Sequence, residues 1–245
     1  MTDDVLTSSN GQQAMNIVLL SSGEWPSTGS LLFSQVYETA LSLRKEGYSV
    51  RWLATIPTVS LLKSLLLRRN DLQNVREACR VAGLPFDYAV IPVSLGSPIS
   101  LPLRSFWLRR AAHRLIARGS LRNLEGSVVL HGRSYDATEL ALKLRDHLRV
   151  AGVKVIASFD MRSWLPPEIP MNHSVLGRLA YGPWKEIEHR LLKESDTRFL
   201  PLEISRRHYS EETGVAITFA PIQGFERPIG WSANFDERWQ ARRIG

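Results

Sequence analysis

The chain has 245 residues, of which 44% are hydrophobic and 22% charged, and its net charge is +7. A chain of this length and composition can bury a sizeable core, as one large or two small domains. Its single cysteine excludes an internal disulfide and a cysteine zinc site, and no apolar run approaches the ~20 residues that a membrane span needs.

Residues 1–14 are polar and carry Asp3 and Asp4, where a secretory signal would place basic residues. We therefore expect a disordered leader over residues 1–14 and a cytoplasmic protein. Any membrane association would then be peripheral, on the inner face of the membrane.

Strand and helix patterns alternate along the chain. Apolar runs predict strands at residues 16–22, 48–55, 86–93, 128–130, 153–159, 197–202 and 216–220. Apolar residues at helical spacing predict helices over residues 32–43, 58–82 with an irregular middle, 103–118, 137–148, 175–195 and 204–213. The alternation predicts an α/β, Rossmann-like fold: a mostly parallel sheet of about six or seven strands with helices on both faces, joined by right-handed crossovers.

The loop after the first predicted strand, SSGEWPSTGSLLF, contains Gly29 and Ser30 just before a helix. Glycines at a helix start let backbone N–H groups approach an anion, so this loop would suit a phosphate or a sugar hydroxyl. A plain helix-entry turn explains the same residues. The loop lacks the G-x-G-x-x-G spacing and the Walker lysine, which argues against a nucleotide fingerprint.

The positive charge is concentrated between residues 61 and 122. This segment has eleven basic residues against three acidic ones, and the rest of the chain is close to neutral. The basic residues are Lys63, Arg68, Arg69, Arg76, Arg80, Arg104, Arg109, Arg110, Arg114, Arg118 and Arg122. Such a local surplus points to an anionic partner, either phospholipid headgroups or nucleic acid.

The predicted helix at residues 103–118 concentrates this charge. Leu103, Trp107, Ala111 and Leu115 recur every four residues, beside a stripe of arginines. This pattern is typical of a helix on an anionic membrane surface, and the candidate contact residues are Trp107, Arg110, Arg114 and Arg118. A helix that packs its apolar stripe on the sheet and exposes its arginines to water would show the same pattern. Nucleic acid is the least favoured partner.

The segment 127–168 predicts a βαβ unit. Its first strand stops at His131-Gly132-Arg133-Ser134, and its second ends at Asp160-Met161-Arg162. In open α/β sheets, ligands bind at the carboxyl ends of the strands. We therefore expect these polar residues to line a binding site.

Several roles are open for the residues of this unit. His131 either contributes to function or forms a structural hydrogen bond to a neighbouring loop. Asp160 and Glu168 form a carboxylate pair, or Asp160 caps a turn and Glu168 pairs with an arginine. Ser134 lies on no nucleophile-elbow motif, so a serine hydrolase order has no support. We expect no metal, because the six histidines show no paired ligand spacing.

Several segments occur in an order and spacing that resemble one enzyme family. They are NIVLLSS with its loop, VVLHGRSY, VIASFDMRSWLPPE, WKEIEHRLLKESD with TRFLPLEISRRHYSEETG, and AITFAPIQGF. Over most of residues 16–226 the chain is similar to the amino-terminal, acceptor-binding domain of the retaining GT-B glycosyltransferases of family 4.

The resemblance implies a hexosyltransferase-type reaction that moves a sugar from a nucleotide-sugar donor to an acceptor, with retention at the anomeric carbon and no cofactor. The acceptor would be a sugar, a lipid or a small molecule. In that family the first loop and the histidine-bearing loop line the cleft. The resemblance therefore implies catalytic roles for His131 and Asp160. The substrate-binding candidates are Gly29, Ser30, Arg133, Ser134, Arg162 and Glu168.

The family's second domain, which binds the nucleotide sugar, has no counterpart in this sequence. We expect a Rossmann-like domain over residues 15–228 and a linker over residues 229–245 towards a donor-binding domain. Either the gene is split or truncated, or the donor-binding domain is a separate chain. The isolated chain would then be inactive. The alternative is a non-catalytic Rossmann-like binding or scaffold module.

Overall fold

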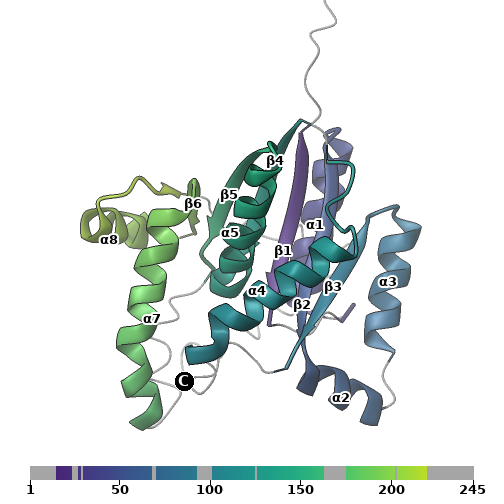
Figure 1. Ribbon diagram of the computed structural model, residues 1–245, viewed down its shortest axis with the longest axis horizontal. Helices are drawn as coiled ribbons and strands as arrows, with labels where there is room; N and C mark the ends of the chain where they lie inside the picture. The colour runs from purple at the N-terminus through teal and green to yellow at the C-terminus, as the bar shows by residue number, and fades with distance from the viewer. Residues whose placement is uncertain are drawn as a thin grey trace, which may run out of the picture.

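Seven parallel strands form one sheet in the order β3-β2-β1-β4-β5-β6-β7 (Figure 1). The computed structural model describes residues 15–23, 27–28, 30–67, 70–92, 101–124, 126–162, 175–201 and 203–219. The strands are β1 (Asn16–Ser22), β2 (Ser49–Pro57), β3 (Phe86–Ile91), β4 (Ser127–Arg133), β5 (Lys154–Asp160), β6 (Thr197–Leu200) and β7 (Thr218–Phe219). The predicted parallel sheet is confirmed. The expected leader at 1–14 and linker at 229–245 lie outside the described residues.

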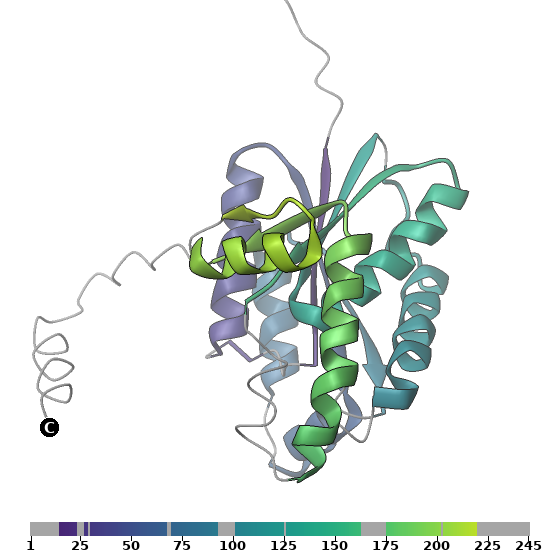
Figure 2. The same cartoon turned by 90° about the vertical axis from the view of Figure 1, so that its left-hand side faces the viewer.

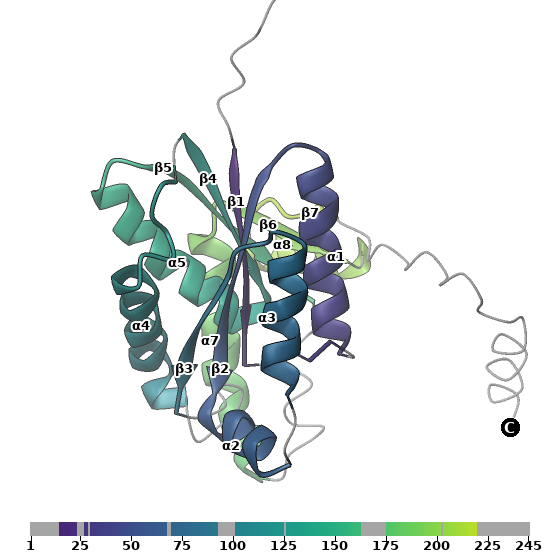
Figure 3. The same ribbon diagram turned by 90° about the vertical axis from the view of Figure 1, so that its right-hand side faces the viewer.

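The described residues also form seven helices, which lie on both faces of the sheet (Figure 2). They are α1 (Leu31–Lys45), α2 (Thr58–Leu66), α3 (Asp71–Val81), α4 (Leu101–Ala117), α5 (Ser134–Val150), α7 (Val175–Glu194) and α8 (Glu203–Thr213). The irregular middle expected within residues 58–82 is where the chain leaves α2 and begins α3. α1 and α3 cover one face, over β1, β2 and β3, and α4, α5 and α7 cover the other (Figure 3).

The buried run in β1 shows why the sheet lies between two helical layers. Ile17 and Leu19 point into the cluster under α1 and α3. Val18 and Leu20 point into the larger cluster under α4, α5 and α7. Because side chains alternate along a strand, a continuous apolar run is what a strand buried on both faces requires.

The strand order places a switch in direction between β1 and β4. From β1 the chain builds outward through β2 to β3, and it then returns to pair β4 with the other side of β1. The helices that follow β1 and β4 therefore lie on opposite faces, and their first turns separate at the carboxyl edge. In doubly wound sheets this is the point at which ligands bind.

Candidate functional site

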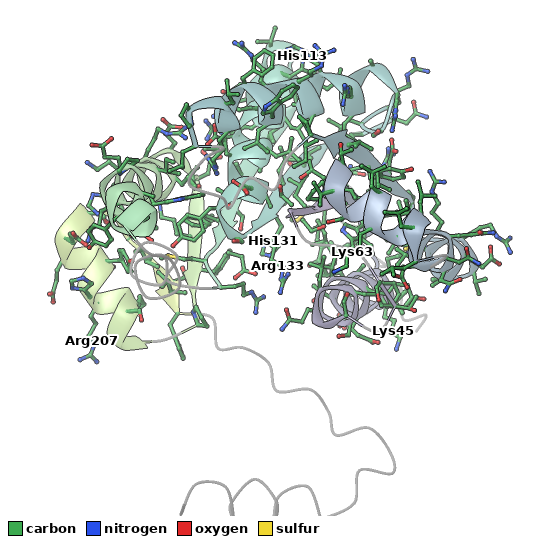
Figure 4. All side chains as sticks on the ribbon, turned by 90° about the horizontal axis from the view of Figure 1, so that it is seen from below. Lys45, Lys63, His113, His131, Arg133 and Arg207 are labelled. Atoms are coloured by element: carbon green, nitrogen blue, oxygen red, sulfur yellow. The ribbon has the colours of Figure 1, made fainter. Side chains whose placement is uncertain are left out.

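The polar ends of β4 and β5 meet at the carboxyl edge of the sheet, next to the switch between β1 and β4. The two strands are paired in register, with His131 opposite Ser158 and Arg133 opposite Asp160. Figure 4 looks onto this edge, and the labelled His131 and Arg133 lie near its centre. The sequence prediction that these strand ends come together is therefore met by the geometry.

Asp160 contacts two side chains, those of His131 and Arg162. Its Oδ2 atom accepts from Nε of Arg162 at 2.6 Å and lies 3.2 Å from Nε2 of His131. The Asp160 side chain is only 7% exposed, whereas His131 is 27% and Arg162 32% exposed. A buried carboxylate thus holds two partly exposed groups that can contact a ligand.

The charge of Asp160 is stabilised by this arrangement. Burial alone would raise the pKa of the Asp160 carboxyl, because it removes water from the charged form. The hydrogen bond and charge of His131, together with Arg162, outweigh burial and lower that pKa below its ordinary value. Asp160 is therefore a carboxylate at neutral pH, which suits it to orient His131 and Arg162 and not to act as a proton donor.

Ser158, His131 and Asp160 contact one another in an order that resembles the catalytic triad of a serine hydrolase. The Ser158 hydroxyl lies 3.2 Å from Nδ1 of His131, on the opposite side of the ring from Asp160. Ser158 is only 1% exposed, so a substrate cannot reach its oxygen. A nucleophile must touch the reacting atom, so Ser158 instead fixes the orientation of the His131 ring.

Arg133 extends from the end of β4 to α1. Its Nη2 atom donates to Oε1 of Gln35, a residue for which the sequence gave no signal. The side chain therefore joins the end of β4 to α1, the helix that follows β1, at the switch point of the sheet. A cation in this place is suited to an anionic group of a ligand.

The turn from β4 into α5 is tight. Gly132 leaves no room for a side chain, because an added Cβ would lie 2.5 Å from Cα of Thr138. Ser134 follows with a φ of 72°, a left-handed conformation that non-glycine residues adopt rarely. The hydroxyl of Thr138 donates to the carbonyl oxygens of Gly132 and Ser134, at 3.1 and 2.8 Å. This close approach fixes the start of α5 against the strand that carries His131.

Ser30 is the N-cap of α1. Its hydroxyl accepts from the backbone N–H of Phe33 at 3.1 Å and donates to the carbonyl of Ser27 at 2.7 Å. These bonds satisfy the start of the helix, which is the function of a serine in a helix-entry turn. Gly29 of the same loop and Glu168 of the loop after β5 lie outside the described residues.

Asp136 is a carboxylate at this edge that the sequence analysis missed. Its Oδ2 atom lies 3.9 Å from the point where Gly23, just after β1, would carry a Cβ. Arg104 of α4 donates to Asp136 from Nε and to Glu139 from Nη1. Asp136 and Glu139 lie three residues apart on α5, but their partner is an arginine of α4, a helix whose arginines were expected to face water or an anionic partner.

The four candidate membrane residues of α4 have different environments. Trp107 packs partly against the core, and Arg110 is exposed. Arg114 donates to the carbonyl of Val90, and Arg118 to that of Tyr88, both at 2.6 Å. These carbonyls belong to β3, an edge strand, so the two arginines cover backbone groups that would otherwise be open to pairing with another chain.

Within the described ranges, no helix combines the length and the apolar character that crossing a bilayer requires. Among the same residues, no three side chains of histidine, cysteine, aspartate or glutamate come together as metal ligands.

The chain shares a general architecture with several solved structures. No family model matches it, and no curated protein matches it in sequence. One similar structure is a Listeria monocytogenes protein named as a UDP-N-acetylglucosamine 2-epimerase, with 11% identity and a TM-score of 0.42, covering 83% of this chain and 44% of that one.

Two other solved structures are similar to the same degree. Arabidopsis thaliana UGT89C1 complexed with UDP has 11% identity and a TM-score of 0.43, over 93% of this chain and 56% of that one. The glycotransferase of kitacinnamycin has 12% identity and a TM-score of 0.43, over 90% and 55%. The chain spans about half the length of each of these proteins. At this level of similarity, the chemistry of the chain has to be judged from its own residues.

Proposed function

We propose that this chain forms the acceptor side of a glycosyltransferase, which transfers a sugar from a nucleotide-sugar donor to an acceptor with retention at the anomeric carbon. The observation that carries the proposal is the group His131, Asp160 and Arg162 at the carboxyl edge of a doubly wound sheet. The resemblance of the sequence to the acceptor-binding domain of family 4 enzymes supports the same reaction. A donor-binding domain, on this protein or on a partner, completes the cleft.

The edge supplies the charges that such a reaction requires. Departure of a nucleoside diphosphate leaves negative charge, which cations and helix N-termini stabilise when they are already in place. Arg133 and Arg162 provide two cations here, and the first turn of α5 opens at the same edge. His131, fixed by Ser158 and Asp160, orients and polarises a hydroxyl of the bound sugar.

The proposal predicts how the chain behaves without a donor-binding domain. Transfer requires donor and acceptor in line at contact distance, and good positioning contributes roughly 7 to 11 kcal/mol to lowering the barrier. The chain supplies the groups for one side of the cleft. Alone it should bind an acceptor weakly and transfer no sugar.

The test uses an extract of source cells that lack the gene for this chain, together with radiolabelled nucleotide sugars and cell lipids. Adding back the wild-type chain should restore transfer, and His131→Ala should not. Arg80→Ala is the matched control, because Arg80 is exposed on α3, where it pairs with its neighbour Glu77. Equal restoration by His131→Ala would instead show a binding or scaffold module.

Running the purified chain without extract tests the second half of the proposal. No labelled product should form. Robust transfer that is lost in His131→Ala would show that the chain holds a complete active site, and the assignment of a donor-binding domain elsewhere would then be wrong.

A further inference from the structure

Helix α2 exposes an unusual number of large apolar side chains. Val59 is 64% exposed, Leu62 53%, Leu65 73%, Leu66 82% and Leu67, which follows the helix, 51%. Contiguous exposed apolar surface is uncommon on soluble domains, and it marks a place where a partner or a membrane is bound. We call these five residues the α2 apolar surface.

The exposed residues surround most of the helix. At 100° per residue, the positions of Val59, Leu62, Leu65, Leu66 and Leu67 span an arc of about 200°. Among the residues of α2, only Ser64 is buried, and it marks the side that faces the sheet. Lys63, also exposed, lies within the apolar arc. A partner helix that packs on α2 would cover a narrower stripe of its surface. Lipid around a helix at the membrane interface contacts a wide arc.

The first turns of α4 carry a second group of exposed apolar side chains. α2 and the start of α4 both lie at the carboxyl edge of the sheet in Figures 1 and 3. Leu103 and Phe106 of α4 belong to the exposed large hydrophobic side chains. Arg109 and Arg110 follow on the same helix and are exposed. Apolar and cationic groups therefore occur together at one end of the molecule.

We infer that the α2 apolar surface inserts into the interfacial layer of an anionic membrane, with Lys63, Arg109 and Arg110 near the lipid headgroups. Leucines that enter the acyl boundary together with basic residues at headgroup level are the two components of an interfacial helix. Each basic residue near the surface adds attraction to anionic lipid. This inference does not depend on the proposed transfer reaction.

The charges favour a membrane over a protein occupant. Lys63 sits among the leucines, where a closely packed protein partner would have to bury its ammonium group or pair it with an acid. At a bilayer surface the long lysine stem lies along apolar groups and its charge reaches the headgroups. The sequence continues from α2 into Arg68 and Arg69, which add to the same local surplus.

The inference assigns the membrane contact to a different part of the basic segment from the one expected. Ala111 and Leu115 of the α4 stripe are buried in the core, and Arg114 and Arg118 donate to β3. The apolar stripe of α4 thus serves the fold. The exposed apolar groups of α2 and of the first turns of α4 remain available.

The test is flotation of the full chain with vesicles of phosphatidylcholine, with and without phosphatidylglycerol. The variant Leu65→Asp/Leu66→Asp places two charges in the α2 apolar surface. The matched control is Val81→Asp/Val150→Asp, since these two valines are also highly exposed but lie at the ends of α3 and α5, at the opposite edge of the sheet. All three proteins are checked for folding by circular dichroism.

Wild type and control should float with the anionic vesicles, and the α2 variant should bind at least about tenfold less, because it removes buried apolar area. Lys63→Glu should weaken binding by several-fold at low salt, and the difference should shrink at high salt because ions screen the charge. Equal binding by wild type and Leu65→Asp/Leu66→Asp would overturn the inference. So would a wild-type dimer that binds no vesicle and becomes a monomer in the α2 variant, because a second copy would then cover the surface.

Discussion

Two clusters of acidic and basic side chains differ in their surroundings. We call them the buried cluster, on helices α4, α5 and α7, and the edge cluster, at the ends of strands β4 and β5. In the buried cluster, Arg104 of α4 is 2% exposed and contacts Asp136 and Glu139 of α5. Arg190 of α7 reaches the same Glu139 at 2.6 Å. In the edge cluster, Asp160 is buried but its partners His131 and Arg162 are partly exposed.

The difference lies in how far each group is open to a ligand. The buried cluster joins three helices, and its members face one another inside the protein. The edge cluster has one anchored carboxylate and two groups that reach solvent at the switch point of the sheet. Similar residue types are thus buried in one place and partly open to solvent in the other.

The largest effect should come from breaking the buried cluster. Arg104→Leu leaves two buried carboxylates without their main partner, which costs roughly 3 to 5 kcal/mol of unfolding free energy. Urea denaturation followed by circular dichroism measures this. Arg80→Ala, which removes an exposed ion pair, should leave stability nearly unchanged. A similar loss in both variants would show that burial of Arg104 is not what matters.

The buried cluster should also give stability a pH dependence. Burial would raise the pKa of Glu139, but Arg104, Lys143 and Arg190 outweigh it and lower that pKa to about 2. Because the unfolded value is about 4.3, Glu139 contributes about 2 to 3 kcal/mol that is present above that pH and is lost as pH falls towards 2.

Glu139→Gln isolates this contribution. The pKa of Asp136 in the same cluster is raised by its burial against the opposing effect of Arg104, so the wild-type curve contains two opposite contributions. The difference in unfolding free energy between wild type and Glu139→Gln should shrink between about pH 5 and pH 2. A difference that stays constant over this range would contradict the lowered pKa.

A third change tests the support of the edge cluster. Gly132→Ala would place a methyl group 2.5 Å from the backbone of Thr138, so α5 must shift away from β4. Forcing an atom into a packed place of this kind costs about 1 to 3 kcal/mol. Thermal unfolding measures the loss. Gly152→Ala is a poor control because its φ is positive. Gly182→Ala is the better control, because its added methyl group meets no neighbouring atom, and alanine inside helix α7 should not destabilise the protein.

The smallest stability effect is expected in the edge cluster itself. Asp160→Asn keeps the shape of the side chain and removes the charge, at a cost of about 1 kcal/mol at neutral pH. Because the pKa of Asp160 is lowered in the folded protein, this contribution should disappear as pH falls below about 4. Urea titrations at pH 7 and pH 3 check the sign. A larger difference between wild type and Asp160→Asn at pH 3 would be the contrary result.

The sequence predicted the fold well because its apolar periods are clear. The first predicted strand, residues 16–22, coincides with β1, and the sheet has the expected parallel strands with helices on both faces. Boundaries moved by a few residues where the pattern is weaker, as in β7, which covers only Thr218 and Phe219. Hydrophobic periodicity along the sequence indicates which residues are buried. The ends of a strand depend on its pairing with segments that are distant in the sequence.

The site was predicted less completely. Strand ends alone placed His131, Arg133 and Asp160 at one edge, because parallel strands end together. The contacts of Gln35 with Arg133 and of Ser158 with His131 join residues 98 and 27 positions apart, and no local pattern signals them. The burial of Arg104 was missed for a different reason: in a helix with several exposed arginines, the sequence does not indicate which arginine is buried.

The central claim is that the edge cluster, and not the buried one, binds a sugar-bearing ligand. Saturation-transfer NMR of the full chain with a mixture of simple sugars, glycosides and nucleotide sugars tests it directly. Transfer to a sugar ligand should occur with wild type and with Arg80→Ala, and it should be lost in His131→Ala and in Asp160→Asn while both stay folded. Signals that persist unchanged in His131→Ala and Asp160→Asn would contradict the account.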